Sequence, residues 1–340
     1  MKKVLMIGGT GTISSPITQK LSADKNVELY VLNRGNKSLP EGTHQIIGDM
    51  QKDMEGVRET LKEESFDVVI NFIIYSMEDA KRNYELFRNK TKQFIFISTV
   101  VTLDNRRTAK VNEENERGNA FSLYGQSKAA IEEFFLSKKE EEGFPVTIVR
   151  PTQTYSDDRI PLSLKGKTYW SVCSRMLRGK EVIVHGDGQG IWAMTHASDF
   201  AKFFVKLVGN EKSIGEIYQI MNPESFSWDE IYYELAKQLG GEYKPVYIST
   251  YLLDASKAYN WRESIHGDKH FSKVFDISKI REIAPEEEFS VDMKTGVKMY
   301  VDYMNAHPEK KLEDEAFDAW CDATIEQYKK ACEIFKGEIK

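Results

Sequence analysis

Apolar residues occur in two alternating patterns along the first half of the chain. Short, mostly apolar runs predict strands that are buried on both faces of a parallel sheet. These runs are Val4–Ile7, Val27–Leu32, Gln45–Ile47, Phe66–Phe72, Gln93–Ile97 and Val146–Val149. Segments with helical spacing of their apolar residues lie between most of them, at about 12–23, 54–64, 77–89 and 123–142. Strands that alternate with helices predict an α/β fold with a Rossmann-type doubly wound parallel sheet.

The alternation loosens after Pro151, and we expect this half of the chain to form a smaller lobe that binds substrate. Its expected elements are strands at Val182–Val184 and Glu216–Met221 and helices at 197–208, at 228–239 and within 309–337. The predicted domains are a dinucleotide-binding Rossmann domain over 1–155, to which a later segment at about 181–208 returns, and a substrate-binding lobe with C-terminal helices over 156–340.

A glycine loop joins the first strand to the first helix. It reads Gly8-x-x-Gly11-x-x-Ser14, with Ser14 in the place of a third glycine. Glycines permit a tight turn and close approach of the backbone to a pyrophosphate, and the N-terminus of the following helix favours an anion. The loop therefore predicts a nicotinamide-dinucleotide site, with a glycine-rich turn that binds nothing as the alternative. The residues expected to contact the cofactor from this loop and from the ends of later strands are Gly8, Thr10, Gly11, Thr12, Ile13, Phe72, Ser98 and Pro151.

The ends of the second and third strands indicate which dinucleotide is bound. Asn33-Arg34-Gly35 follows the second strand, where an acidic residue would accept hydrogen bonds from the adenosine ribose. No acid is present, and Arg34 is placed to contact a 2′-phosphate, which favours NADP over NAD; a surface arginine in a turn is the alternative. Asp49, beside Met50 after the third strand, is expected either to accept from the adenine amino group or to cap a helix.

Tyr124 and Lys128 lie four residues apart on a predicted helix that follows Thr99 in the chain. A tyrosine is a poor base at neutral pH, but a lysine one turn away lies on the same helix face, and its charge favours the phenolate. Thr99 ends the fifth strand, where its hydroxyl can orient a substrate oxygen. Proton abstraction by Tyr124, with hydride transfer to a nicotinamide ring, completes an alcohol oxidation. We therefore expect these three residues to be catalytic, and Tyr124 and Lys128 also to contact the cofactor, whose nicotinamide ribose the ammonium can hold; a surface Tyr–Lys pair is the alternative.

Composition narrows the class of protein. The 340 residues carry a net charge of −6, which argues against a broad nucleic-acid surface. No apolar run approaches the ~18 residues needed to span a bilayer, and the apolar part of the first segment is too short for a signal peptide, so we expect a cytoplasmic protein. The three cysteines have no metal-ligand spacing, and no metal ion is expected.

These motifs together resemble the extended short-chain dehydrogenase/reductase family, in its NAD-dependent epimerase/dehydratase branch. The resemblance covers most of residues 1–240. It continues through three further segments, Val149-Arg-Pro151 with Tyr155, Gly186-Asp-Gly188, and Thr195-His196-Ala-Ser-Asp199-Phe-Ala201. It implies a Rossmann-like domain, a tightly bound nicotinamide cofactor, a sugar or sugar derivative as substrate, and frequent homodimers through the helix that carries the tyrosine.

Three departures from this family bear on function. Val100-Val101 stand where the 4,6-dehydratases have an Asp-Glu pair, so dehydration by that route is not expected. Trp192 stands where nucleotide-sugar epimerases hold the substrate pyrophosphate with an arginine, and its ring is expected to contact substrate by stacking on a sugar. The third departure, the missing acid at Asn33-Arg34, also resembles the branch that includes chloroplast stem-loop RNA-binding proteins.

The function predicted from the sequence is an NAD(P)-dependent sugar-type epimerase that acts through a transient keto intermediate. An NADP-dependent carbonyl reductase or dehydrogenase is the alternative. A third hypothesis is an RNA-binding protein on the same fold without enzymatic activity. The negative net charge and the intact set of Tyr124, Lys128 and Thr99 disfavour this third hypothesis.

Overall fold

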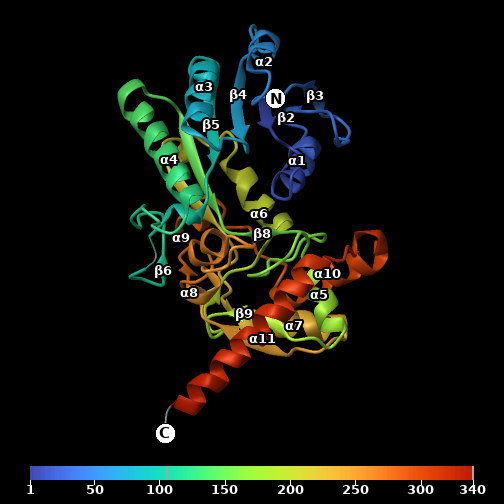
Figure 1. Ribbon diagram of the computed structural model, residues 1–340. Coiled ribbons are helices and arrows are strands. Elements are labelled where there is room, and N and C mark those ends of the chain that lie inside the picture. Colours follow the sequence, from blue (N-terminus) through green and yellow to red (C-terminus); the bar gives the residue numbers. More distant parts are fainter. Residues whose placement is uncertain (105, 339–340) are drawn as a thin grey trace. The chain divides into compact units, whose positions relative to one another are not determined.

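The computed structural model describes residues 1–104 and 106–338, which form two compact units (Figure 1). The first unit comprises Met1–Thr154, Thr195–Pro223 and Phe275–Ser290. The second comprises Tyr155–Met194, Glu224–Val274 and the residues from Val291 onward. Each unit has its own set of buried side chains, so each is described by itself.

Within the described residues, a seven-stranded parallel sheet organises the first unit. Its strands lie in the order β12-β7-β5-β4-β1-β2-β3. Their bounds are β1 (Lys2–Ile7), β2 (Val27–Asn33), β3 (His44–Ile47), β4 (Phe66–Asn71), β5 (Thr91–Ile97), β7 (Val146–Pro151) and β12 (Ile217–Ile220). The chain runs outward from β1 to β3 and then places β4 on the other side of β1, so the strand order reverses beside β1. This confirms the predicted Rossmann-type sheet, in which ligands bind at the carboxyl ends near the reversal.

Helices cover both faces of this sheet (Figure 1). On one face α1 (Ser14–Ala23) packs beside α6 (Ala197–Phe204), and on the other α3 (Met77–Phe87) packs beside α4 (Leu123–Glu142). Buried aromatic rings fill the space between the sheet and the second pair of helices, among them Phe87, Phe94, Phe96, Phe135 and Phe144. The other elements of the first unit are α2 (Met54–Thr60), η1 (Val100–Thr102), β6 (Lys110–Val111), β11 (Thr195–His196), η2 (Val205–Leu207), η3 (Glu211–Ser213) and α9 (Ser278–Ile283).

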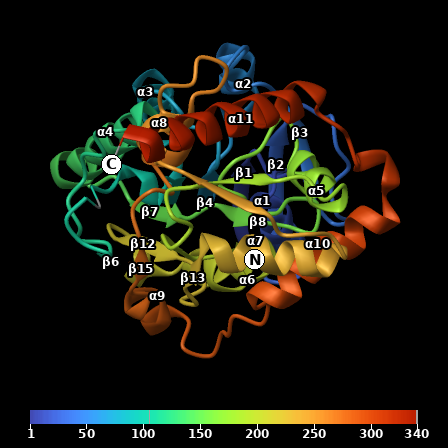
Figure 2. The same cartoon turned by 60° about the horizontal axis from the view of Figure 1, so that its bottom comes forward.

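The second unit is built around a separate core in which several large aromatic side chains are buried, including Trp170, Trp192, Trp228, Tyr232 and Phe317. Figure 2 shows α7 (Trp228–Leu239) and α10 (Met293–Ala306) beside each other in this unit. The parallel pair β9 (Val182–His185) and β14 (Pro245–Ile248) and the antiparallel pair β10 (Ile191–Trp192) and β13 (Phe226–Ser227) complete its strands. Its other elements are α5 (Trp170–Leu177), α8 (Thr250–Leu253), the π-helical turn η4 (Arg262–His266), η5 (Pro308–Lys310) and α11 (Glu315–Glu338). Two short strands, β8 (Thr154–Tyr155) and β15 (Val274–Phe275), lie where the chain passes from one unit to the other.

The C-terminal helix expected within 309–337 is present as α11, and it docks on the second unit. Phe317 is buried in the core of that unit. The guanidinium of Arg175, which is 1% exposed, lies 2.5 Å from the carboxylate of Asp318 and 2.7 Å from that of Asp322. Apolar contact and a buried arginine together hold the first half of α11 in place.

Two expectations about the second half of the chain were wrong in detail. Residues 181–194, expected to return to the Rossmann domain, belong to the second unit because β9 pairs with β14 there. The segments that return are Thr195–Pro223 and Phe275–Ser290, of which residues 209–223 and 275–290 were expected in the substrate-binding lobe. The helix expected over 197–208 ends at Phe204 and continues as the 3-10 turn η2. Residues 181–194 belong to the second unit because β9 pairs with β14, which is distant in sequence. No local sequence pattern predicts such a pairing.

Candidate cofactor pocket and catalytic residues

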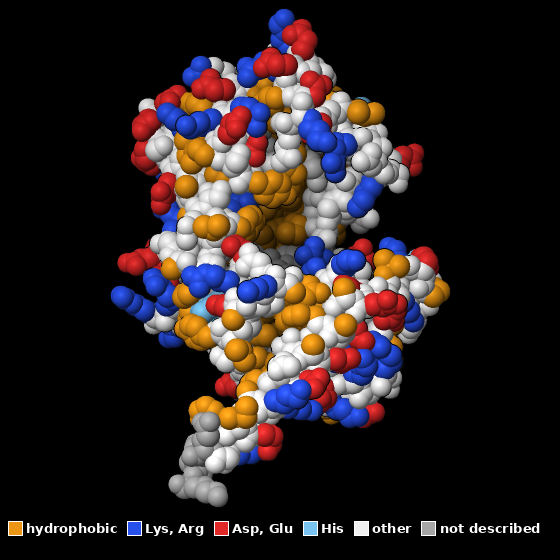
Figure 3. Space-filling model, in the orientation of Figure 1, with side chains coloured by type: hydrophobic (Ala, Val, Ile, Leu, Met, Phe, Trp, Pro, Cys, Tyr) orange, Lys and Arg blue, Asp and Glu red, His pale blue; other side chains and the backbone are white. Residues whose placement is uncertain are grey.

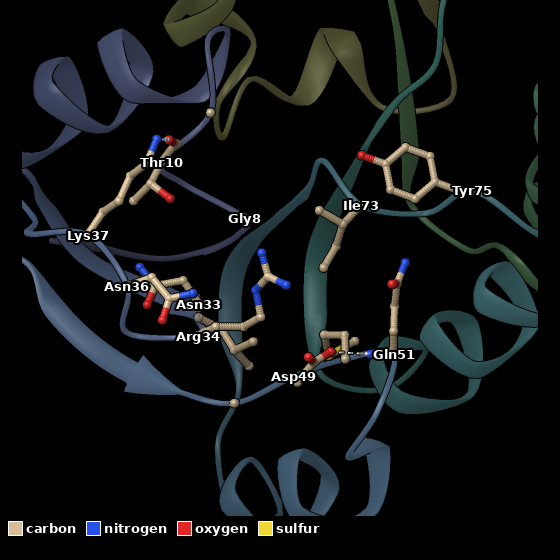
Figure 4. A pocket seen from close by; sticks show the side chains of 14 residues that line it. Gly8, Thr10, Asn33, Arg34, Asn36, Lys37, Asp49, Gln51, Ile73 and Tyr75 are labelled. Carbon is tan, nitrogen blue, oxygen red and sulfur yellow. Dashed lines mark hydrogen bonds between the residues drawn. The ribbon is translucent and has the colours of Figure 1, made fainter. Parts of the chain in front are cut away.

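The carboxyl ends of four adjacent strands meet at one edge of the sheet in the first unit. Ile7 at the end of β1 lies beside Leu32 on one side and Asn71 on the other, and Asn33 lies beside Ile47 of β3. The loops that follow these strands enclose a pocket of about 470 Å³ (Figure 4). Its lining residues are Gly8, Thr10, Gly11, Leu32, Asn33, Arg34, Asn36, Lys37, Gly48, Asp49, Met50, Gln51, Ile73 and Tyr75. The pocket therefore lies at the reversal of strand order, where a Rossmann-type sheet binds its ligand.

The glycine loop forms the wall of this pocket beside β1. Gly8 has a φ of +92°, which favours glycine, and an added Cβ would lie 2.9 Å from Cγ2 of Ile73. Ser14 Oγ donates to the carbonyl oxygen of Gly8 at 2.8 Å and accepts from the amide of Gly11 at 2.8 Å. Ser14 thus closes the loop with two hydrogen bonds, where the third glycine of the usual motif serves helix packing alone.

Two cations reach the pocket from the segment after β2. In Figure 4 the guanidinium of Arg34 points into the pocket, and within the described residues it makes no hydrogen bond or ion pair. The ammonium of Lys37 donates to the carbonyl oxygen of Thr10 at 3.0 Å, which places it against the glycine loop. The pocket therefore presents positive charge at the end formed by β2 and the glycine loop, which suits an anion.

The side chain of Asn33, the last residue of β2, is held by hydrogen bonds to its oxygen, and among the described residues its amide nitrogen is an unused donor. Its Oδ1 accepts from the amide of Gly35 at 2.8 Å and from Nε2 of Gln45 at 2.9 Å. Its Nδ2 is buried and has no acceptor among the described residues. A buried donor without a partner carries a free-energy cost of about 1 to 3 kcal/mol, which an acceptor oxygen on a ligand would remove. Asn33 thus adds a donor to the two cations.

Asp49 is held by the backbone at the start of the segment after β3. Its Oδ1 accepts from the amide of Gln51 at 3.0 Å and from the amide of Lys52 at 3.2 Å (Figure 4). The hydrogen bond from the Gln51 amide, joined by that from Lys52 and by the charge of Arg34, lowers the pKa of the Asp49 carboxyl. The helix-capping role expected for Asp49 is not observed, because Asp53 is the N-cap of α2; Asp49 closes the turn before that helix and lines the pocket.

The other end of the pocket, formed after β4, adjoins Lys128. Ile73 and Tyr75 line the pocket, and the Lys128 ammonium donates to the carbonyl oxygen of Ile74 between them at 2.7 Å. It also donates to the carbonyl oxygen of Ile97, the last residue of β5, at 2.8 Å. Lys128 is therefore attached to the same segment that forms the pocket wall.

Burial controls the charge of Lys128. The residue is 2% exposed, and its burial lowers the pKa of the ammonium to about 7. The carboxylates of Glu132 and Asp79 oppose this fall in pKa. A lysine with a pKa near neutrality changes its charge in response to small changes in its surroundings, which is common at functional sites.

Tyr124 and Lys128 lie one turn apart on α4, as the sequence predicted. The Lys128 ammonium is 5.9 Å from the centre of the Tyr124 ring, and 40% of Tyr124 is exposed. Thr99 follows β5, is 7% exposed, and accepts from the amide of Val101 at 3.2 Å. The structure therefore places the accessible phenol of Tyr124 and the buried ammonium of Lys128 on α4. The hydroxyl of Thr99 follows β5, the strand whose last carbonyl oxygen accepts from Lys128.

Gly125 allows the start of α4 to pack against η1. A Cβ on Gly125 would overlap with the carbonyl oxygen of Val101. Ser122 caps the helix by accepting from the amide of Gly125 at 2.8 Å, and Asn119 Nδ2 donates to the Val101 carbonyl at 2.8 Å. The position of Tyr124 relative to Thr99 thus depends on a residue without a side chain.

Gly125→Ala is expected to lower the free energy of unfolding by about 1 to 3 kcal/mol, because α4 must move away from Val101. Thermal unfolding measures this change. Gly337→Ala is the matched control, since a Cβ on Gly337 in α11 meets nothing within 4 Å and should be neutral or slightly stabilising. Equal melting temperatures for the two variants would contradict the close approach of α4 to η1.

The pocket contains only some of the residues predicted to contact a cofactor. Those that line it come from the glycine loop and from the ends of β2 and β3, namely Gly8, Thr10, Gly11, Asn33, Arg34, Asp49 and Met50. Those that do not line it lie just before α1, at the ends of later strands or on α4, namely Thr12, Ile13, Phe72, Ser98, Pro151, Tyr124 and Lys128. Lining residues that the sequence did not reveal are Leu32, Asn36, Lys37, Gly48, Gln51, Ile73 and Tyr75. Among these, Lys37 had a usable signal, a second cation shortly after Arg34.

Ser98 was expected to contact the cofactor, but its side chain is engaged elsewhere in the structure. It is 3% exposed, and its Oγ donates to Oε1 of Glu132 at 2.5 Å. The side chain therefore joins the end of β5 to α4. We correct the expectation of a direct cofactor contact through this side chain.

Trp192 was expected to stack on a sugar, and its surroundings in the structure do not support this role. It is 0% exposed and lies in the core of the second unit. Its ring centre is 5.4 Å from that of Trp228, and the Lys273 ammonium lies 4.8 Å from it. A ring covered in this way has no face open to a substrate. The expectation failed because nothing in the local sequence distinguishes a buried tryptophan from an accessible one.

The reversed parallel sheet, the glycine loop at its switch point and the Tyr–Lys pair on α4 define an extended short-chain dehydrogenase/reductase. The family model described as the NAD dependent epimerase/dehydratase family matches residues 4–220. The chain belongs to this family, which is a family of enzymes.

Individual relatives are distant. The chloroplast stem-loop binding protein of 41 kDa b from Arabidopsis thaliana is 26% identical over 254 residues, which is 70% of this chain and 64% of that protein. The chain thus spans less than two thirds of the length of this relative. A putative UDP-glucose 4-epimerase from Methanocaldococcus jannaschii is 22% identical over 311 residues, covering 81% of this chain and 98% of that protein.

A solved structure shows the same fold over nearly the whole chain. UDP-glucuronic acid 4-epimerase from Bacillus cereus, in complex with UDP-glucuronic acid and NAD, superposes with a TM-score of 0.69 at 19% identity. The match covers 89% of this chain and 99% of that chain. At this level of identity the likeness concerns the fold.

Among residues 1–104 and 106–338, no helix has the length and apolar character needed to cross a membrane.

Proposed function

We propose that this protein is an NAD(P)-dependent epimerase that acts on a sugar-type substrate and uses Tyr124 to move the proton. The observation that carries the proposal is the attachment of Lys128 to the wall of the pocket, at the carbonyl oxygen of Ile74, with Tyr124 one turn away on the same helix. A dinucleotide site and a base are thus parts of one continuous structure.

The residues of the pocket fit a dinucleotide. Gly8 leaves a space that a Cβ would close against Ile73, as close approach of a pyrophosphate requires. Arg34 and the orphan Nδ2 of Asn33 offer donors to an anion at the adenosine end. When bound, the dinucleotide supplies a carbon that accepts a hydride and returns it.

The catalytic work of the chain is to move one proton and hold one oxygen. Tyr124, held as the phenolate by the charge of Lys128, takes the proton from the substrate hydroxyl. The carbon that bears this hydroxyl becomes a ketone because it would give its hydride to the bound dinucleotide. Thr99 donates a hydrogen bond to the same substrate oxygen. With a dinucleotide bound, the hydride would return to the opposite face of the ketone while Tyr124 returned the proton to the same oxygen, which would invert the carbon and restore the starting state.

The test is a stoichiometry. The protein is incubated with candidate UDP- and dTDP-hexoses and NADP or NAD, and both the sugar products and the reduced cofactor are quantified. Interconversion of epimers without net formation or loss of reduced cofactor supports the proposal. Formation of one NADPH per oxidised product, or consumption of one NADPH per product when the matching keto sugar and NADPH are supplied, would instead show the alternative, a carbonyl reductase or dehydrogenase. The epimerases among the relatives make these sugar nucleotides the first substrates to try.

We further propose that NADP is preferred over NAD. Arg34, Lys37 and the unpartnered Nδ2 of Asn33 lie at the end of β2, where an adenosine ribose is held in this fold. An acidic side chain at this place would bind the 2′-hydroxyl, whereas two cations and a donor complement a 2′-phosphate.

The double variant Arg34→Ala/Lys37→Ala is expected to weaken NADP binding by roughly 100-fold or more, since hydrogen bonds to charged groups contribute about 1.5 to 3 kcal/mol each and two are lost. Affinity for NAD should change by much less. Titration calorimetry with both nucleotides measures the ratio. Arg58→Ala on α2, an exposed arginine paired with Glu55, is the matched control. An unchanged ratio of NADP to NAD affinity would remove the basis for this preference.

RNA binding is a second candidate because of the Arabidopsis stem-loop binding relative. On the face drawn in Figure 3, acidic and basic side chains are interspersed and form no continuous basic band. Nucleic-acid binding depends on neutralised phosphates and falls steeply with salt. Salt-dependent binding of a stem-loop RNA, together with no redox activity on any sugar, would favour this candidate over the enzyme.

A further inference from the structure

A buried carboxylate joins the elements that carry the candidate catalytic residues. Glu132 is 0% exposed and lies one turn beyond Lys128 on α4. Arg150 of β7, also 0% exposed, approaches it with Nε 2.9 Å from Oε1 and Nη2 2.6 Å from Oε2. Ser98 donates to Oε1 at 2.5 Å, and Arg117 Nη1 lies 3.5 Å from Oε2. One side chain thus ties α4 to the ends of β5 and β7.

One partner of Glu132 is a sequence neighbour of a residue proposed for the reaction, since Ser98 immediately precedes Thr99. Another partner, Arg150, lies near the carboxyl end of β7, the strand beside β5. Glu132 itself shares a helix with Tyr124 and Lys128. A shift of Glu132 would therefore be transmitted to the phenol, the ammonium and the threonine hydroxyl together.

The surroundings of Lys128 show why this carboxylate matters electrically. The ammonium donates its observed hydrogen bonds to two neutral carbonyl oxygens, those of Ile74 and Ile97. The carboxylates that act on it are Glu132 on α4 and Asp79 on α3. Aromatic rings of Tyr75, Phe96 and Tyr124 also face it, with centres 5.1, 4.7 and 5.9 Å from the ammonium. Asp79 is shared with Arg82, which lies 3.0 Å from it.

We propose that Glu132 is a positioning residue for the reaction: its carboxylate fixes α4 against the ends of β5 and β7 and, one helical turn from Lys128, supplies negative charge that favours the ammonium form beside Tyr124. The inference rests on the proposed function. If Glu132 were only a structural partner of Arg150, it would fix α4 but would not affect the charge of Lys128. The two possibilities can be distinguished by removing both charges of the Glu132–Arg150 pair together.

The informative change is the double variant Glu132→Gln/Arg150→Met. Removing only one partner leaves an unpaired buried charge and is strongly destabilising, whereas replacing both by neutral side chains of similar size is often tolerated. The glutamine retains an acceptor for the Ser98 hydroxyl. Glu133→Gln is the matched control, because this neighbouring carboxylate has a side chain that is 64% exposed and its charge is screened by solvent.

Two quantities are measured in the full-length protein. The first is the titration midpoint of Lys128, followed by NMR of lysines labelled with ¹³C at Cε, with the resonance assigned by its absence in Lys128→Met. The second is the dissociation constant for NADPH. In the double variant the midpoint should fall by up to about one pH unit, since the Glu132 carboxylate that raises it is lost and the simultaneous loss of the Arg150 cation offsets only part of this effect, and the dissociation constant should rise by on the order of 10-fold through misplacement of Lys128. The Glu133→Gln control should match the native protein in both.

A folded double variant whose Lys128 midpoint and NADPH affinity equal those of the native protein would overturn the proposal and leave Glu132 as a structural partner of Arg150. This failure is distinct from failure of the proposed function. If the native protein binds no nicotinamide dinucleotide, the proposed function fails, while the Lys128 midpoint still decides whether Glu132 controls the charge of that ammonium.

Discussion

Tyr124→Phe should lower the rate of sugar interconversion by about 10²- to 10⁴-fold, the range expected for loss of a general acid–base group. The ring, which is 40% exposed, keeps its place on α4 and only the hydroxyl is removed. Because the pocket is lined by residues of the β1, β2, β3 and β4 loops, the affinity for the dinucleotide should stay within a few-fold of the native value. Turnover and dinucleotide affinity, measured separately, check the two halves of this expectation.

The control for this variant is Tyr233→Phe. Tyr233 lies on α7 in the second unit and is 58% exposed, so it loses the same hydroxyl at a site with no proposed role. Near-native turnover in Tyr124→Phe would exclude Tyr124 as the base. A parallel loss in both variants would point to a general effect on the protein and not to proton transfer.

Lys128→Met should have the second large effect, a loss of turnover on the order of 100-fold or more. Without the ammonium, the Tyr124 phenol loses the charge that favours its ionised form. Methionine is close to lysine in length and fills the buried site, so the loss reflects charge and not an empty cavity. Lys81→Met, an exposed change on the neighbouring helix α3, is the control and should leave turnover unchanged.

The same variant should change how stability depends on pH. The pKa of Lys128 is about 7 in the folded protein against 10.5 for an ordinary lysine. Between these values the unfolded chain binds more protons, so Lys128 makes the free energy of unfolding rise with pH. Its burial cost is fully present below about pH 7 and absent above 10.5. The native protein should therefore gain roughly 3 to 5 kcal/mol of unfolding free energy from Lys128 as the pH rises between these two values. Lys128→Met should lack this gain, so the variant's unfolding free energy minus the native one should fall by the same amount over this range.

Denaturant unfolding at a series of pH values measures this difference. Other titrating groups are common to both proteins and cancel when the two curves are subtracted. A difference that stays constant with pH would show that Lys128 keeps an ordinary pKa in the folded protein. The account of a buried ammonium bonded only to neutral carbonyls would then be wrong.

Local sequence patterns predicted the sheet and the glycine loop because parallel buried strands are apolar throughout. Val4–Ile7, for example, is 0% exposed at every position. The Tyr124 and Lys128 pair was visible because residues four apart share a helix face. Arg34 was found because the expected acid is missing at the end of β2. Each of these inferences uses residues close together in the chain.

What the sequence did not predict depends on contacts between distant residues. The carbonyl partners of Lys128, at Ile74 and Ile97, are backbone groups that no side-chain pattern marks. The pairing of Glu132 with Arg150 and Ser98 joins three elements of the fold. Trp192 failed as a substrate contact for the same reason, since its burial is decided by Trp228 and Lys273 from later parts of the chain.

The most direct test of the central claim is made on protein purified without added cofactor. The protein is denatured, the released nucleotide is identified by mass spectrometry, and the emptied protein is titrated with NADP and NAD. The account predicts NADP, either carried through purification or bound on titration in preference to NAD, because of Arg34 and Lys37 at the end of β2. Release of no nucleotide, together with no binding of either dinucleotide on titration, would contradict it.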